Sequence, residues 1–354
     1  MEQITNSLEI LEQLMCPAFI VKDHKIIRAN SAAQQLQILP DTSLDSLLGN
    51  GKADYELFAA GKLCLSLSIE GYSHPATVTA LEDAHLFCME SQLEKPEMQA
   101  YALAAQILRG PLSNAMLGID QLLTTKDSSI TEQAAKINRN LHQLLRAVSN
   151  MSDAAQYADT EAGQLQPQDI MWALDEVLQR AAPLTAQAGH TLTYDLPNCS
   201  VICRINREKL ERAVLNLISN ATKYASQNSP VQVAVRLSDT RISLIVENEL
   251  STNSTPVGNI FSRYLRQPGI EDARTGIGLG LSIVRSVATI HGGTVLLEQP
   301  DNKLRITMSI PLENAAATTL CSPVSLPVHY SGGYVSELIE LSDCLPYHLY
   351  DGTK

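Results

Sequence analysis

Three glycines at alternate positions, Gly276, Gly278 and Gly280, stand directly before an apolar pattern of helical spacing that begins at Leu281. Because glycine has no side chain, the backbone there can approach a phosphate closely, and a helix that follows points free N–H groups and its positive dipole end at the anion. The spacing differs from the dinucleotide-binding fingerprint, and a long irregular segment rather than a strand precedes these glycines. The pattern predicts a phosphate-binding loop whose meaning depends on the motifs upstream.

A second motif upstream, Asn216-Leu-Ile-Ser-Asn220-Ala-Thr-Lys223-Tyr224, and a third between the two, residues 260–266, make the pattern more specific. In this order the three stretches resemble the N, F and G2 boxes of the sensor histidine kinases, whose ATP-binding domain belongs to the GHKL superfamily. The resemblance covers about residues 97–313, and more weakly 8–90. It implies a GHKL (Bergerat-type) α/β sandwich with ATP between the N-box helix and a lid.

The resemblance also implies roles for single residues. Asn220 would ligate Mg²⁺, because a neutral amide oxygen suits a hard cation that keeps most of its waters. Lys223 would reach the phosphates, and Asn216 holds the position at which ATP-hydrolysing relatives carry a general-base glutamate, so efficient activation of water is not expected. The implied ATP-binding residues are Asn216, Asn220, Lys223, Tyr224, Asn248, Gly276, Gly278, Gly280 and Leu281.

The family's G1 box departs most from its usual pattern here. Residues 241–248 alternate like a strand, and Asn248 falls in phase where the family has an aspartate that binds the adenine amino group. Asn248 can still accept a hydrogen bond, without the strength that a charge adds. Both glycines of this box are absent, and a strand shifted by one residue would instead present Glu247 but reverse the face pattern.

The phosphoacceptor position decides what chemistry remains. The family's H box, His-Glu-Leu-Arg-Thr-Pro-Leu, matches residues 106–112 without gaps, at Leu108, Arg109, Pro111 and Leu112, and Gln106 stands at the histidine. An imidazole attacks phosphorus through an in-plane lone pair, whereas the nitrogen lone pair of an amide is delocalised into the carbonyl. We therefore expect no catalytic acceptor. An alternative register would make His142 the acceptor, but it lacks the Arg-x-Pro context and reads better as a surface or interfacial structural histidine.

These motifs need elements that position them. Apolar residues recur at helical spacing over residues 98–123 and 130–157, with a polar loop between, which predicts an antiparallel helical hairpin. In the family, two such hairpins pair as a dimeric four-helix bundle. Residues 8–93 resemble a small PAS domain, with a hairpin turning at Asp23-His24; Asn30 lies where PAS domains often carry an asparagine, and a turn residue is the alternative.

The predicted fold is multidomain α+β. The expected units are a PAS-like α/β sensory domain at 8–93, the dimerisation hairpin at 97–160, the GHKL nucleotide-binding domain at 164–313 and an unassigned extension at 314–354. For the extension, an amphipathic helical turn over 334–341 allows a partner-binding tail, or a segment packed on the body or partly disordered.

Composition bounds the partners. A formal net charge of −12 argues against nucleic acid as the main partner. No apolar run approaches the length of about 18 residues that a membrane span needs, and a basic signal-peptide start is lacking, so we expect a cytoplasmic protein without a membrane span. The seven cysteines show no metal-site spacing and read as reduced thiols.

Three functions remain open. The first is a degenerate sensor histidine kinase (a pseudokinase of a two-component system) that binds ATP and Mg²⁺, forms a homodimer, and docks a response regulator or another histidine kinase. The second is an active GHKL protein kinase or ATPase that acts in trans or on a non-standard acceptor. The third is an interaction module with an inactive nucleotide pocket.

Overall fold

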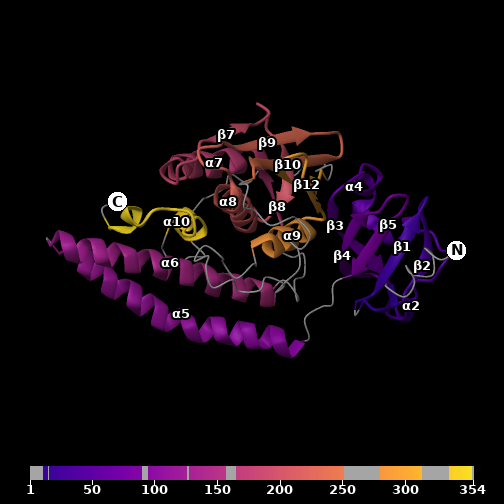
Figure 1. Ribbon diagram of the computed structural model, residues 1–354, viewed down its shortest axis with the longest axis horizontal. Helices are drawn as coiled ribbons and strands as arrows, with labels where there is room; N and C mark the ends of the chain where they lie inside the picture. The colour runs from indigo at the N-terminus through magenta and orange to yellow at the C-terminus, as the bar shows by residue number, and fades with distance from the viewer. Residues whose placement is uncertain are drawn as a thin grey trace.

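The computed structural model describes residues 11–14, 16–89, 95–125, 127–156, 165–250, 280–312 and 335–352. Figure 1 shows a helical hairpin along one edge and two sheet-containing parts beside it. No helix within these ranges is both long and apolar enough to cross a bilayer.

The N-terminal part is a five-stranded antiparallel sheet in the order β2-β1-β5-β4-β3. Its hairpin turns at Asp23-His24, as predicted, and both residues have positive φ. Phe19 and Phe87 stack with ring centroids 4.8 Å apart in its core. The elements are β1 (Ala18–Lys22), β2 (Lys25–Ala29), α2 (Ser31–Gln35), α3 (Asp45–Leu48), the 3₁₀ turn η1 (Gly49–Gly51), α4 (Lys52–Glu56), β3 (Lys62–Ile69), β4 (Tyr72–Ala80) and β5 (His85–Met89).

Asn30 is a buried organising residue of this part. Its Oδ1 accepts hydrogen bonds from the backbone N–H of Ala18 and of Ala33, so the side chain caps α2 and also holds β1. Its Nδ2 donates to the carbonyls of Leu11 and Cys16, among others. A buried amide with this many partners fixes the backbone around it. The assignment of this part as a PAS domain remains a prediction.

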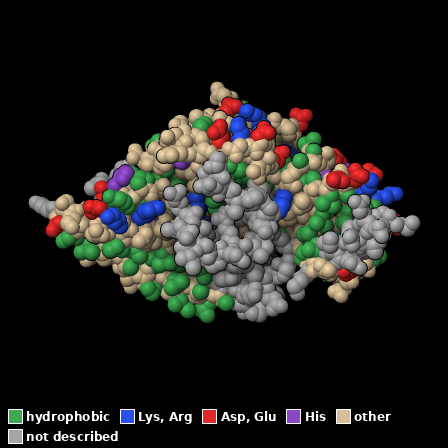
Figure 2. All heavy atoms as spheres, in the orientation of Figure 1, with side chains coloured by type: hydrophobic (Ala, Val, Ile, Leu, Met, Phe, Trp, Pro, Cys, Tyr) green, Lys and Arg blue, Asp and Glu red, His purple; other side chains and the backbone are tan. Residues whose placement is uncertain are grey.

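Two long helices, α5 (Lys95–Leu123) and α6 (Ser128–Gln156), form the predicted antiparallel hairpin. Its described core is small and includes Ala105, Leu112, Met116, Leu145 and Val148. Large apolar side chains remain exposed along α5, among them Leu103, Ile107 and Leu117, and Figure 2 shows hydrophobic side chains gathered along the outer edge of the hairpin. An apolar strip of this kind on a helical hairpin is typical of a surface that another molecule covers.

The third part is a GHKL-type α/β sandwich. Three helices cover one face of a sheet in the order β11-β12-β10-β9-β7, and a separate two-stranded sheet, β6-β8, lies beside it. The helices are α7 (Ile170–Gln187), α8 (Arg207–Tyr224) and α9 (Gly280–Ile290), and the strands are β6 (Gln166–Asp169), β7 (Leu192–Asp195), β8 (Ile202–Ile205), β9 (Val231–Leu237), β10 (Arg241–Glu249), β11 (Thr294–Glu298) and β12 (Lys303–Pro311).

The two sheets are joined edge to edge, which the sequence did not predict. β3 pairs with β11 over Cys64↔Val295 and its neighbours, so that ten strands form one sheet. Asp54 fastens this junction through a 2.6 Å ion pair with Arg241 and a 2.8 Å hydrogen bond from Ser309 Oγ. The N-terminal part is therefore attached directly to the nucleotide-domain sheet as well as through the hairpin.

Residues 335–352, called here the C-terminal segment, pack against both the hairpin and the sandwich. They form the short helix α10 (Ser336–Glu340) and the 3₁₀ turn η3 (Tyr347–Tyr350). In Figure 1 this segment lies between α6 and the sandwich. Residues 335–352 therefore pack on the body of the protein, which is one of the two interpretations given for the extension.

Candidate functional site

The N-box motif lies on α8, and the helix is well defined at both ends. Asn206 caps its start by accepting a hydrogen bond from the backbone N–H of Lys209 at 3.1 Å, and Glu208 in the first turn complements the helix dipole. Lys223 lies in the last turn, where a cation is favoured for the same reason. The inner face of α8 packs on the sheet, so its polar motif residues are positioned by a rigid element.

The first residue of α9, Gly280, lies directly against the N-box amides. A Cβ atom at Gly280 would stand 3.1 Å from Oδ1 of Asn216 and 3.5 Å from Nδ2 of Asn220. A side chain at this position would therefore be tightly packed against the N-box amides. The structure brings these two motifs together, although they are 60 residues apart in sequence (280 − 220).

Asn248 on β10 is buried on the face that also carries Ile242, Leu244 and Val246. This is the phase that the alternating pattern predicts. Its Nδ2 donates to the carbonyl of Glu249 at 3.1 Å. Glu247 lies on the opposite face in ion pairs with Lys303 and Arg305, so the register shifted by one residue is wrong.

Lys223 and Tyr224 end the N-box helix beside the C-terminal segment. The Lys223 side chain is 8% exposed, and its Nζ lies 3.8 Å from Oδ2 of Asp343 and 5.7 Å from the ring centroid of Tyr224. The ammonium is thus held close to a carboxylate of the chain itself. A role in phosphate binding remains a prediction.

The surroundings of Asn216 are polar, and the sequence did not predict them. Asn216 is fully buried; its Oδ1 accepts from Arg146 Nη2 at 3.0 Å, and its Nδ2 donates to the Arg212 carbonyl and to Oε2 of Glu340 at 2.9 Å. Both amide hydrogens are therefore used by protein groups. In this arrangement the Asn216 side chain is held by Arg146, Arg212 and Glu340. Its predicted contact with ATP stays a prediction.

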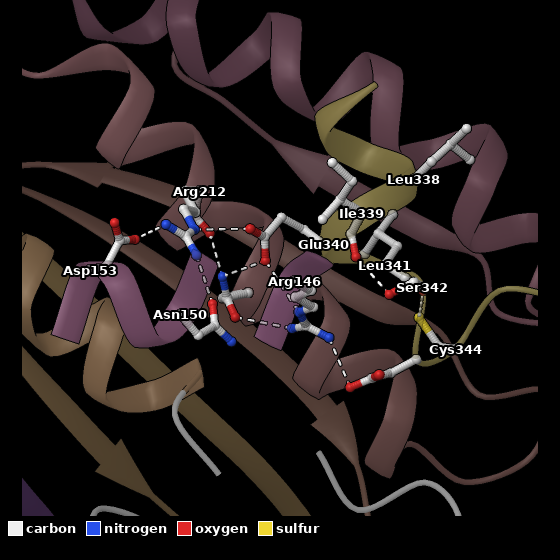
Figure 3. A network of polar contacts seen from close by, with 12 residues as sticks. Arg146, Asn150, Asp153, Arg212, Leu338, Ile339, Glu340, Leu341, Ser342 and Cys344 are labelled. Atoms are coloured by element: carbon white, nitrogen blue, oxygen red, sulfur yellow. Dashed lines mark hydrogen bonds and ion pairs between the residues drawn. The ribbon is translucent and has the colours of Figure 1, made fainter. Parts of the chain in front are cut away.

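Arg146, Arg212 and Glu340 form a buried ionic network around that amide (Figure 3). The carboxylate of Glu340 accepts from Arg146 Nε at 3.2 Å and from Arg212 Nε at 2.9 Å. A stripe of polar residues at four-residue spacing on α6, Asn138, His142, Arg146 and Asn150, is the sequence signal that could have revealed this network. Such a stripe in an otherwise amphipathic helix indicates a buried polar contact.

His291, just after α9, connects the two motif-bearing helices. Its Nε2 accepts a 3.0 Å hydrogen bond from the backbone N–H of Asn206, and Nδ1 lies 2.7 Å from the Val287 carbonyl. Because a backbone N–H can only donate, the imidazole is neutral with the proton on Nδ1. Burial lowers the pKa of His291, which favours the same neutral form.

Gln106 is exposed on α5, five residues before Pro111, which lies within the helix. His142 is buried, contrary to the surface alternative. Its Nδ1 lies 2.9 Å from the Asn138 carbonyl, and its ring packs edge-on against Tyr350 at 4.9 Å between centroids. Burial lowers its pKa. His142 is thus an interfacial structural residue beneath the C-terminal segment.

Part of the predicted site lies outside the described residues, namely Gly276, Gly278 and the F-box stretch 260–266. Within the described ranges, no group of three His, Cys, Asp or Glu side chains could hold a metal ion. The residues present still fit Mg²⁺ bound chiefly through phosphates and water, because the Asn220 amide beside Gly280 offers a neutral oxygen ligand.

Comparison with known proteins agrees with this geometry. Residues 205–314 match the family described as histidine kinase-, DNA gyrase B-, and HSP90-like ATPase. The chain is 28% identical over 207 residues to the probable sensor protein PcoS of Escherichia coli, covering 56% of this chain and 43% of that protein. It is 25% identical over 298 residues to the sensor histidine kinase CusS of Escherichia coli strain K12, covering 82% of this chain and 57% of that protein.

The crystal structure of full-length ShkA in complex with AMPPNP superposes with a TM-score of 0.48 at 21% identity, over 62% of this chain and 47% of that one. The chain spans less than two thirds of the length of the curated relatives named above.

Proposed function

We propose that this protein, which is related to the sensor histidine kinases and carries their ATPase domain, is a signalling pseudokinase. It binds ATP with Mg²⁺ and regulates through protein docking rather than by phosphorylating a histidine of its own. The observation that carries the proposal is Gln106, an amide at the phosphoacceptor position of a preserved helical hairpin. An amide nitrogen has no free lone pair with which to attack the γ-phosphate.

Nucleotide binding is supported by the packing of Gly280 against Asn216 and Asn220. In the proposed role, the N–H groups at the start of α9 hold the phosphates, Asn220 supplies an oxygen to Mg²⁺, and Lys223 neutralises phosphate charge. Mg²⁺, when bound, would offset the negative charge of the phosphates. Asn248 would accept a hydrogen bond from the base, since it lies buried on the helix-facing side of β10.

Self-association is supported by the exposed apolar strip of the hairpin. Leu103 and Leu117 are each 58% exposed and Ile107 is 61% exposed on one chain. A second copy that packs its own hairpin there would bury these side chains in a four-helix bundle. We propose this homodimer as the form that docks a response regulator or another histidine kinase.

The experiment combines two measurements on the full chain. Calorimetric titration with ATP and Mg²⁺ tests binding, and incubation with radiolabelled ATP tests transfer to the chain itself. Binding without labelling is the expected result. Labelling of a partner protein would favour the alternative of a kinase acting in trans, and absence of any binding heat or thermal shift would favour the inactive-pocket module.

A further inference from the structure

The C-terminal segment (335–352) supplies apolar side chains to two cores at once. Ile339 belongs to the core of the helical hairpin, whereas Leu341, Leu345 and Tyr350 belong to the core of the sandwich. Each of these four side chains is at most 2% exposed. A single short segment therefore bridges two bodies that otherwise have separate cores.

The segment also bridges the two bodies through charge. Glu340 of α10, with a side chain 0% exposed, receives Arg146 from α6 on one oxygen and Arg212 from α8 on the other. Asp343 pairs with Arg146 at 2.9 Å and lies near Lys223. Figure 3 shows Glu340 between the two guanidinium groups.

The groove that holds the segment is cationic by its own residues. α6 and α8 contribute Arg146, Arg212 and Lys223, and Asp153 of α6 pairs with Arg212. The two remaining carboxylates of the network, Glu340 and Asp343, come from the C-terminal segment. Two buried arginines facing one another repel unless an anion lies between them. Glu340 offsets this repulsion, and it adds to the direct contacts that Arg146 makes with Asn216 and Arg212 makes with Asp153 across α6 and α8.

Side chains of α6 also donate hydrogen bonds to backbone carbonyls of the C-terminal segment. Arg139 donates from Nε and Nη2 to the carbonyls of Ser342 and Asp343, both at 3.2 Å. Asn138 donates from Nδ2 to the Tyr350 carbonyl at 3.0 Å. Charge pairing, apolar anchors and backbone recognition together are the features of a peptide-binding groove.

We propose that the groove between α6 and α8 is a binding site for an acidic helical peptide. Its ligand in this structure is the chain's own C-terminal segment. This segment acts as a releasable latch that holds the nucleotide domain against the hairpin. Release removes the anion between Arg146 and Arg212 and weakens the contact between α6 and α8. It also breaks the hydrogen bond between the Asn216 amide and Glu340. An effect of this change on nucleotide binding rests on the proposed function, whereas the latch itself does not.

The test is amide hydrogen exchange of the full chain without nucleotide, so that its result does not depend on whether ATP binds. The wild-type protein is compared with Glu340→Gln, which removes the bridging charge at nearly constant shape. The matched control is Asp54→Asn, which breaks an ion pair at a different junction of the chain, the one with Arg241. We expect Glu340→Gln to speed exchange at least about tenfold in residues 336–350 and in the facing turns of α6 and α8, with β10 and β12 unchanged. Asp54→Asn leaves the groove protected.

A locked variant keeps the test decisive. Ser219 on α8 lies beside the thiol of Cys344, so Ser219→Cys places a second thiol there. Diamide removes one hydrogen from each thiol and forms the disulfide. In Ser219→Cys combined with Glu340→Gln, oxidation is expected to restore protection of the groove, and a reductant to abolish it again. The proposal is overturned if Glu340→Gln exchanges like the wild type, if protection is lost throughout the sandwich, or if the disulfide leaves exchange in α6 fast.

Discussion

Arg146 on α6 donates a hydrogen bond from Nη2 to Oδ1 of Asn216 on α8 over 3.0 Å. This bond joins the helix that follows the phosphoacceptor position to the first asparagine of the nucleotide motif. Both residues are buried, at 6% and 0% exposure. The sandwich is therefore tied to the hairpin through Asn216, a residue of the motif that is expected to serve ATP.

Gly280→Ala should weaken ATP binding by about tenfold or more. The new Cβ would lie 3.1 Å from Oδ1 of Asn216, which is tighter than ordinary packing and would displace the amides or the start of α9. Calorimetric titration with ATP and Mg²⁺ measures the effect. The control is Gly118→Ala on α5, where a Cβ meets nothing within 4 Å and should raise helix stability by up to about 1 kcal/mol. Equal affinities for both variants would contradict the proposed site.

Gly61→Ala should destabilise the junction between the two sheets. Gly61 has a φ of +89°, and a Cβ there would lie 2.2 Å from the Leu297 carbonyl oxygen on β11. Gly71→Ala is the matched control, because its φ of +83° imposes the same backbone strain of about 1–2 kcal/mol while a Cβ meets nothing nearby. Urea unfolding should show a larger loss for Gly61→Ala, together with faster hydrogen exchange in β11. Equal losses would mean that the β3–β11 pairing adds no stability.

The free energy of unfolding should fall as the pH drops below about 6.5, in part because of His291. In the unfolded chain the imidazole takes up a proton near its ordinary pKa of about 6.5, whereas burial keeps the folded pKa lower. The contribution is thus complete above pH 6.5 and is lost progressively as the pH falls toward the folded pKa. Protonation would also end the hydrogen bond that Nε2 of His291 accepts from the backbone N–H of Asn206.

Urea titrations at pH 7.5 and 5.5 measure this effect. His291→Gln should show a smaller loss between the two pH values than the wild type. His74→Gln, at a partly exposed position on β4, serves as the control and should lose as much as the wild type. A His291→Gln variant with undiminished pH dependence would assign the acid sensitivity to other groups.

The sequence predicted the local elements because these depend on short-range patterns, whereas the proximity of Gly280 to the N box was implied by the family resemblance alone. Alternation in residues 241–248 predicted that Asn248 shares the buried face, and the Asp23-His24 turn followed from its flanking strands. Contacts that depend on chain-distant surfaces carry no such pattern. The polar stripe on α6 indicates a buried polar contact at Arg146 but does not identify its partner Glu340, 194 residues away, and the β3–β11 junction has no sequence signal of its own.

Leu117→Glu should convert a dimer to a monomer. The side chain is 58% exposed on the outer strip of the hairpin, and a carboxylate there would be desolvated in a four-helix bundle. Light scattering coupled to size-exclusion chromatography measures the mass. Leu57→Glu, at 83% exposure on the N-terminal part, is the control and should remain dimeric. A wild-type monomer at micromolar concentration would contradict the proposed homodimer.

Phosphoryl transfer to the chain itself tests the central claim most directly. The full chain and Gln106→His are each incubated with radiolabelled ATP and Mg²⁺, and acid-labile label is counted on the protein. The account predicts no label on the wild type, because an amide stands at the acceptor position. Label on Gln106→His would show that the nucleotide-binding residues and the hairpin can still carry out phosphoryl transfer. Stoichiometric label on the wild-type chain, mapped to His142 or any other residue, would contradict the account.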